Sequence, residues 1–178
     1  VGTISKVKQM LKLPNGTLRI LVEGIERGKI EQYSEGQEFT TATISTFEKN
    51  TLVDTETEAL MRTLLSYFEK YAKASSKITT ETIDSITDLK DPSRLADVIA
   101  SHLPFKIAEK QEVLNIDNVK KRLDHLIIRL HDEQEILELE KKINLNVKKA
   151  MERTQKEYYL REQLKAIQTE LGDREGKT

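Results

Sequence analysis

The chain of 178 residues contains no cysteine, so it can form neither a disulfide framework nor a thiolate metal site or nucleophile. This absence suits a reducing compartment. No apolar run approaches the roughly 20 residues that cross a bilayer. No basic segment followed by an apolar one opens the chain, so we expect neither a membrane span nor a secretory leader. Proline and glycine are absent throughout residues 117–171, which removes the usual helix breakers from that stretch.

Charge is abundant but balanced. Charged residues make up 33% of the chain, above the roughly 25% of an average soluble protein, and such an excess is typical of long solvated helices. Lys and Arg total 29, Asp and Glu total 30, and the net charge is −1. This balance gives no overall attraction to nucleic acid or to an anionic membrane.

Residues 1–50 are predicted to form a β subdomain. Asn15 and Gly16 give a strong hairpin signal, because both residues accept a positive φ in a type I′ turn. Gly24 and Gly28 are expected to end the strand that follows this turn. The segment "KIEQY" then predicts another strand, and "EFTTATISTF", rich in Thr and Ile, predicts the last one.

Residues 51–116 are predicted to form a helical bundle. Thr55 and Glu58 fit a capping box, and apolar residues recur behind them at helical spacing. Asp91 and Pro92 fit the cap and the first position of a second helix. Shorter helices are expected on both sides of it.

Residues 117–172 are predicted to form one helix about 80 Å long, at 1.5 Å per residue. An apolar seam marks its first part: Val119, Leu123, Leu126 and Leu130. A second seam, with 4-3-4 spacing, marks its last part: Leu160, Leu164, Ile167 and Leu171. Between the seams the acidic "DEQEILELE" is followed by a basic stretch. A small domain cannot bury so long a helix, so part of it is expected to face a partner.

Several sequence features look like functional sites but lack the residues or the spacing that such sites require. In "GDREGKT" only three residues separate the two glycines, whereas a phosphate-binding loop needs four, so Gly172 is predicted to cap the helix and residues 173–178 to be a linker. The three histidines do not converge on a common point, and no metal site is expected. No nucleophile, base and oxyanion donor can be assembled, so no catalytic residue is predicted. Glutamates interrupt the basic stretch, which argues against nucleic-acid binding there.

Seven residues near the end of the chain are the candidate contacts with a substrate or partner: Met151, Tyr158, Tyr159, Leu160, Leu164, Ile167 and Leu171. The adjacent tyrosines Tyr158 and Tyr159 lie about 100° apart on a helix, so only one of them can occupy the seam fully. The other lies at the seam's edge or is available to a partner. Packing within the chain and contact with a partner both stay open for this pair.

Four segments together resemble the N-terminal region of bacterial Lon proteases: "QMLKLPNGTLRILVEGIERGKI", "DPSRLADVIASHLPFKIAEKQEVL", "EILELEKKI" and "MERTQKEYYLREQLKAIQTELG". They span most of the chain. The chain begins with Val1, in strand-like alternation, rather than with methionine, so we expect a fragment cut at both ends. The resemblance implies that the opening strands of the β subdomain lie before Val1.

The resemblance also implies a fold and a function. The fold is α+β, a partial β subdomain followed by an α-helical subdomain that ends in one very long helix. Lon proteases are cytoplasmic, homohexameric, ATP-dependent serine proteases that remove misfolded and short-lived regulatory proteins. This region would be non-catalytic: it would recognise and position unfolded or damaged protein substrates and support hexamer assembly. The alternative is a purely structural oligomerisation stalk with little substrate affinity. The parent protein uses ATP and Mg²⁺, while no cofactor is expected in this chain.

Overall fold

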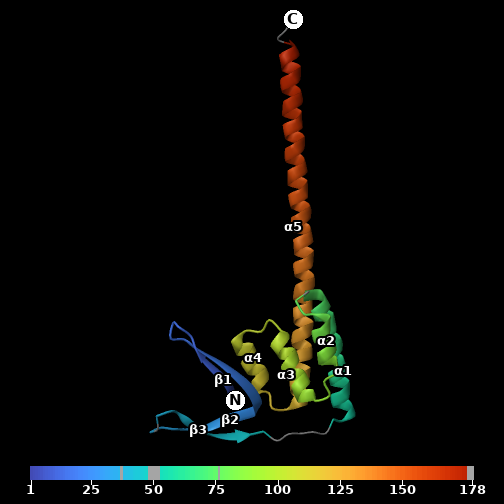
Figure 1. Ribbon diagram of the computed structural model, residues 1–178. Coiled ribbons are helices and arrows are strands. Elements are labelled where there is room, and N and C mark those ends of the chain that lie inside the picture. The colour runs from blue at the N-terminus through green and yellow to red at the C-terminus, as the bar shows by residue number, and fades with distance from the viewer. Residues whose placement is uncertain (37, 48–52, 76, 176–178) are drawn as a thin grey trace. The chain divides into compact units, whose positions relative to one another are not determined.

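The computed structural model describes residues 1–36, 38–47, 53–75 and 77–175 (Figure 1). Within these residues, a three-stranded antiparallel sheet precedes five helices, and the last helix is very long, which confirms the predicted α+β class. Two compact units divide the chain, Val1–His131 and Asp132–Thr178. The finer division into four segments stays a prediction. Among the described residues, no helix combines the length and the apolar character that crossing a membrane requires.

Strand β2 is longer than the sequence suggested. The strands β1 (Gly2–Lys12), β2 (Leu18–Ser34) and β3 (Thr41–Thr46) pair in the order β1-β2-β3. The prediction that Gly24 and Gly28 end a strand is wrong, because β2 runs through both. A Cβ at Gly24 would lie 3.1 Å from a side-chain carbon of Thr3, and one at Gly28 would lie equally close to Ile4. These glycines therefore allow close cross-strand contact instead of breaking the strand.

The first hairpin forms as predicted, but its turn differs. The Gly16 N–H donates to the Leu13 carbonyl at 2.9 Å, so Pro14 and Asn15 are the central residues. The predicted type I′ turn centred on Asn15 and Gly16 is wrong. Proline fixes φ near −65° and favours the first central position of a turn. Gly16 follows with a φ of 82°, a left-handed conformation that glycine adopts without strain. The Thr17 N–H completes the turn by donating to Asn15 Oδ1 at 3.1 Å.

Helix α1 (Thr55–Ser75) begins at a different cap from the one predicted. Asp54 Oδ1 accepts hydrogen bonds from the Thr57 backbone N–H at 2.9 Å and from the Thr57 hydroxyl at 2.7 Å. The capping box assigned to Thr55 and Glu58 is therefore wrong. A carboxylate one residue earlier already satisfies an N–H group of the first turn, and aspartate is among the best N-cap residues.

Three short helices follow: α2 (Thr80–Thr87), α3 (Pro92–His102) and α4 (Ile107–Asn115). Helix α3 begins as predicted, because the Asp91 carboxylate accepts from two backbone N–H groups and Pro92 is the first helical residue. Helices α2 and α4 confirm the shorter helices expected on either side.

The apolar core lies among the helices of the first unit. Its fully buried members come from α1, α2, α3 and the first turns of α5 (Val119–Glu175): Leu64, Phe68, Ile86, Leu95, Ala96, Ile99, Leu123, Leu126 and Leu130. The first seam predicted for the long helix is thus buried at its three leucines. Each such side chain contributes roughly 1.5–3 kcal/mol relative to leaving it exposed.

Helix α5 does not stop at its glycine. It continues through Gly172 to Glu175, so the predicted cap at Gly172 is wrong, and the expected linker 173–178 begins in helical conformation. Residues 176–178 lie outside the described part of the chain. A glycine inside a helix costs roughly 0.5–1 kcal/mol relative to alanine, which a helix of this length tolerates near its end.

Candidate functional site

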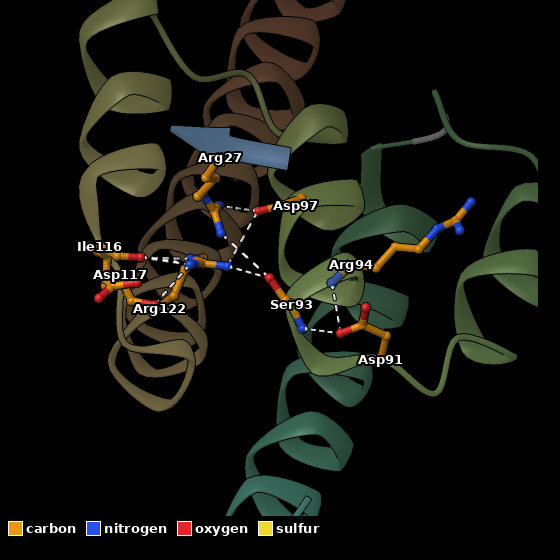
Figure 2. A network of polar contacts seen from close by, with 8 residues as sticks. All are labelled: Arg27, Asp91, Ser93, Arg94, Asp97, Ile116, Asp117 and Arg122. Carbon is orange, nitrogen blue, oxygen red and sulfur yellow. Dashed lines mark hydrogen bonds and ion pairs between the residues drawn. The ribbon is translucent and has the colours of Figure 1, made fainter. Parts of the chain in front are cut away.

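Two arginines from distant parts of the chain meet at the start of α3 (Figure 2). Arg27, on β2, places Nη2 2.5 Å from Asp97 Oδ1 and Nη1 3.5 Å from Ser93 Oγ. Arg122, on α5, places Nη1 2.9 Å from the same Ser93 Oγ and 3.7 Å from the same Asp97 oxygen. Both guanidinium groups therefore share the two acceptors that α3 provides.

Arg122 is a charged residue inside the core. Its side chain is 2% exposed. Nε and Nη2 donate to the Ile116 carbonyl at 2.9 and 2.7 Å, and Nη2 also donates to the Asp117 carbonyl at 3.1 Å. Burial, followed by the positive charge of Arg27, lowers the pKa of Arg122 to about 10, although nearby carboxylates oppose the shift. The guanidinium therefore stays protonated at neutral pH.

This network was not predicted from the sequence. One local signal was available: Arg122 stands beside Leu123, three positions after Val119 and four before Leu126, on the apolar side of the helix. A charge at such a position indicates a buried, hydrogen-bonded side chain. Its partners Ser93 and Asp97 lie on another element, α3, and could not be found from helical spacing.

The network supplies hydrogen bonds and charge but no reactive group. Arginine does not lose its proton in proteins, and Asp97 is engaged with both guanidiniums. Within the described ranges, no cluster of three or more His, Asp or Glu side chains could hold a metal ion. The arrangement is suited to joining β2, α3 and α5.

The seven predicted contact residues all lie on the second half of α5. Their exposed fractions range from 52% to 67%: Met151, Tyr158, Tyr159, Leu160, Leu164, Ile167 and Leu171. So many large apolar side chains exposed on one element commonly mark an interaction surface. Their role as contacts stays a prediction.

These residues divide between two faces of the helix. At 100° per residue, Tyr158 lies about 20° from Met151 but about 160° from Leu160. We call the side that carries Met151 and Tyr158 the Met151–Tyr158 face. The opposite side, the Leu160–Leu171 face, carries the residues of the second seam within a sector of about 60°. Tyr159 lies between the two faces, and its hydroxyl accepts a hydrogen bond from Gln163 Nε2 at 2.9 Å.

The Met151–Tyr158 face also carries a shallow, largely apolar hollow. Its lining residues lie within nine positions of the helix: Val147, Ala150, Met151, Thr154 and Gln155. The hollow can therefore accept an apolar side chain from another polypeptide.

The fold is that of a Lon N-terminal domain. The structure matches the N-terminal domain of Mycobacterium avium complex Lon protease with a TM-score of 0.65 and 25% identity, over 74% of this chain and 69% of that one. The family model described as the ATP-dependent protease La (LON) substrate-binding domain matches residues 1–132. The chain belongs to this family, and the resemblance inferred from the sequence is confirmed.

Full-length relatives agree with this assignment. The chain is 56% identical over 178 residues to Lon protease 1 of Bacillus subtilis (strain 168), covering 100% of this chain and 23% of that protein. It is 46% identical over 173 residues to Lon protease of Escherichia coli (strain K12), covering 97% of this chain and 22% of that protein. The chain therefore spans less than a quarter of the length of these relatives.

Proposed function

We propose that this chain captures unfolded or damaged protein substrates and positions them for an ATP-dependent serine protease. The observation that carries the proposal is an exposed apolar face, with its hollow around Met151, on the helix that continues beyond the matched substrate-binding domain of residues 1–132. An unfolded polypeptide exposes apolar side chains, and covering them gains about 25 cal/mol per Å² of apolar area. Because this gain is non-directional, it suits substrates that share no sequence.

The same proposal places the other activities outside this chain. We expect ATP and Mg²⁺ to act, and peptide bonds to be cleaved, in the longer part of such a protease. The relatives extend well beyond the matched stretch, which leaves room for those domains. A cytoplasmic location fits this role, because misfolded proteins accumulate where they are made.

Binding of a permanently unfolded probe tests the proposal. Reduced, carboxymethylated α-lactalbumin carrying a fluorophore would be titrated with the chain, and its anisotropy measured. Tyr158→Ser and Met151→Ser should each weaken binding several-fold, because each removes apolar area from one face. Ile107→Ser is the matched control, since Ile107 is 88% exposed on another element. Equal weakening by all three variants, or no saturable binding, would reject the proposal.

A second candidate function is assembly. The Leu160–Leu171 face has heptad spacing and lies opposite the Met151–Tyr158 face, so the two faces could be occupied at once. We propose that it packs against a neighbouring helix of a second copy or of an ATPase domain, as hexamer assembly would require. Placing an unpaired charge in such a contact costs several kcal/mol.

Sedimentation over a wide concentration range tests the assembly role. Leu164→Asp should abolish concentration-dependent association of the chain, and in a full-length protease it should weaken hexamer formation. Tyr158→Ser should leave association unchanged. If the Leu164→Asp variant associates as before, both as this chain alone and in a full-length protease, the assembly role is rejected. This result would not bear on substrate capture.

A further inference from the structure

The sheet of the first unit has little apolar attachment of its own. Among the described residues of its three strands, only Gly28 is buried. Next to it, Arg27 reaches Asp97 and Ser93 on α3. A hydrogen bond from Gln111 Nε2 to the Val1 carbonyl at 3.0 Å is exposed. Arg27, beside the buried point, gives β2 a polar connection to α3.

We propose that Asp97 is the shared counter-ion of an electrostatic latch, which holds strand β2 against helix α3 through Arg27 while also balancing the buried charge of Arg122. This device is independent of substrate capture. The 2.5 Å contact to Arg27 and the 3.7 Å contact to Arg122 converge on the same carboxylate oxygen. Ser93 Oγ likewise accepts a hydrogen bond from each of the two guanidinium groups.

The two arginines are not held equally firmly, so we expect the latch to release at Arg27. Arg122 has three further hydrogen bonds to the carbonyls of Ile116 and Asp117 and is fixed inside the core. In the described part of the chain, the buried Nε of Arg27 has no hydrogen-bond partner. Losing the charge of Asp97 would leave two mutually repelling guanidiniums, and the less firmly held Arg27 would leave with its strand.

This asymmetry predicts a specific coupling between two substitutions. Asp97→Asn should lower the melting temperature by several degrees, because the two guanidiniums then repel each other in the folded state until Arg27 and its strand detach. Arg27→Gln should lower it far less, since Asp97 then serves Arg122 alone. In the double variant, Arg27→Gln should suppress most of the effect of Asp97→Asn. Additive shifts in melting temperature would overturn the latch.

The matched controls are exposed residues of the same types outside the network. Arg19 lies on β2 and Asp124 on α5, and both residues are exposed. Their variants Arg19→Gln and Asp124→Asn are the controls. Circular dichroism during thermal unfolding would follow all five variants. A control that shifts the melting temperature as much as its network counterpart would also contradict the proposal, because loss of charge alone would then explain the result.

The position of the sheet can be measured directly. The chain has no cysteine, so Gln9→Cys on β1 and Ser66→Cys on α1 would take up two spin labels and no others. Pulsed electron–electron double resonance should give a narrow distribution of distances between the two labels in the chain that carries only these two substitutions. Adding Arg27→Gln or Asp97→Asn should broaden it, while the control substitutions should not. Unchanged widths, or a background already as broad as the variants, would overturn the latch.

Discussion

Arg122 keeps its charge in the core because every nitrogen of its guanidinium group donates a hydrogen bond to an acceptor. Carbonyl groups of Ile116 and Asp117, with the Ser93 hydroxyl, surround it. A charge buried in this way is costly to desolvate, and removing one partner leaves the others unsatisfied. The residue therefore fixes the start of α5 against the turn that precedes it.

Arg122→Met should destabilise the chain by about 3–5 kcal/mol, because the two carbonyls would lose their donors inside the core. Chemical denaturation followed by circular dichroism measures this change. Arg94→Met is the control: the Arg94 side chain is exposed and points away from the network (Figure 2). Its free energy of unfolding should change by no more than about 0.5 kcal/mol. Similar losses in both variants would contradict this account of Arg122.

Asp54 links stability to pH. The hydrogen bond from Lys120, followed by those from Thr57, lowers the pKa of the Asp54 carboxyl well below its ordinary value. A folded-state pKa below the unfolded one gives stability that is present above the unfolded pKa, about 3.9, and is lost as pH falls toward the folded one. Lys120 also contacts Glu56, so the pairing ties the start of α1 to the start of α5.

Asp54→Asn should therefore lower the melting temperature at about pH 7 and have a progressively smaller effect below about pH 4, where Asp54 begins to be protonated in the unfolded chain. Asparagine keeps the capping ability, so the difference isolates the charge. Glu81→Gln, at an exposed position on α2, serves for comparison. A penalty from Asp54→Asn that stays constant down to about pH 2 would show that the charge is not responsible.

At the scale of the element, α5 is one helix with two kinds of surface. Leu126 is fully buried, whereas Leu164 is 56% exposed. Leu126→Ala should cost about 2–5 kcal/mol of unfolding free energy, because it leaves a cavity in the core. Leu164→Ala should change it by no more than about 0.5 kcal/mol. Urea denaturation of the two variants compares them directly. A large loss from Leu164→Ala would mean that the second seam belongs to the core of this chain.

Gly172 tests where the long helix ends. Its conformation is helical and nothing lies within 4 Å of a Cβ placed there. Gly172→Ala should therefore raise the helix content slightly and stabilise the last turns by up to about 1 kcal/mol. Carbon chemical shifts of residues 168–175 report this change residue by residue. Lower helicity in the alanine variant would favour the glycine cap that the sequence suggested.

The elements that the sequence predicted correctly depend on neighbours in the chain. The start of α3 needs only Asp91 and Pro92, and the first hairpin needs only the turn residues after β1. The glycines of β2 were misread because their role depends on Thr3 and Ile4 on the paired strand. The arginine network was missed for the same reason, since Arg27 and Asp97 stand 70 positions apart.

At the scale of the whole molecule, the chain combines a stable helical core with a long exposed helix. The core and the arginine network belong to the unit Val1–His131, and the seven candidate contact residues belong to the unit Asp132–Thr178. Substitutions at the contacts should therefore change binding without changing folding. The resemblance to Lon proteases predicted the family and the fold class, and the division of the contacts between two faces follows from their spacing along a continuous helix.

Photocrosslinking tests the central claim, capture of unfolded protein by the Met151–Tyr158 face, most directly. A benzophenone amino acid would replace Tyr158 in one sample and Leu164 in another, each irradiated with carboxymethylated α-lactalbumin. We predict strong crosslinks to the unfolded protein from position 158, and from position 164 crosslinks mainly to a second copy of the chain. Equal labelling of the unfolded protein from both positions, or none from position 158 when the probe is bound, would contradict the account.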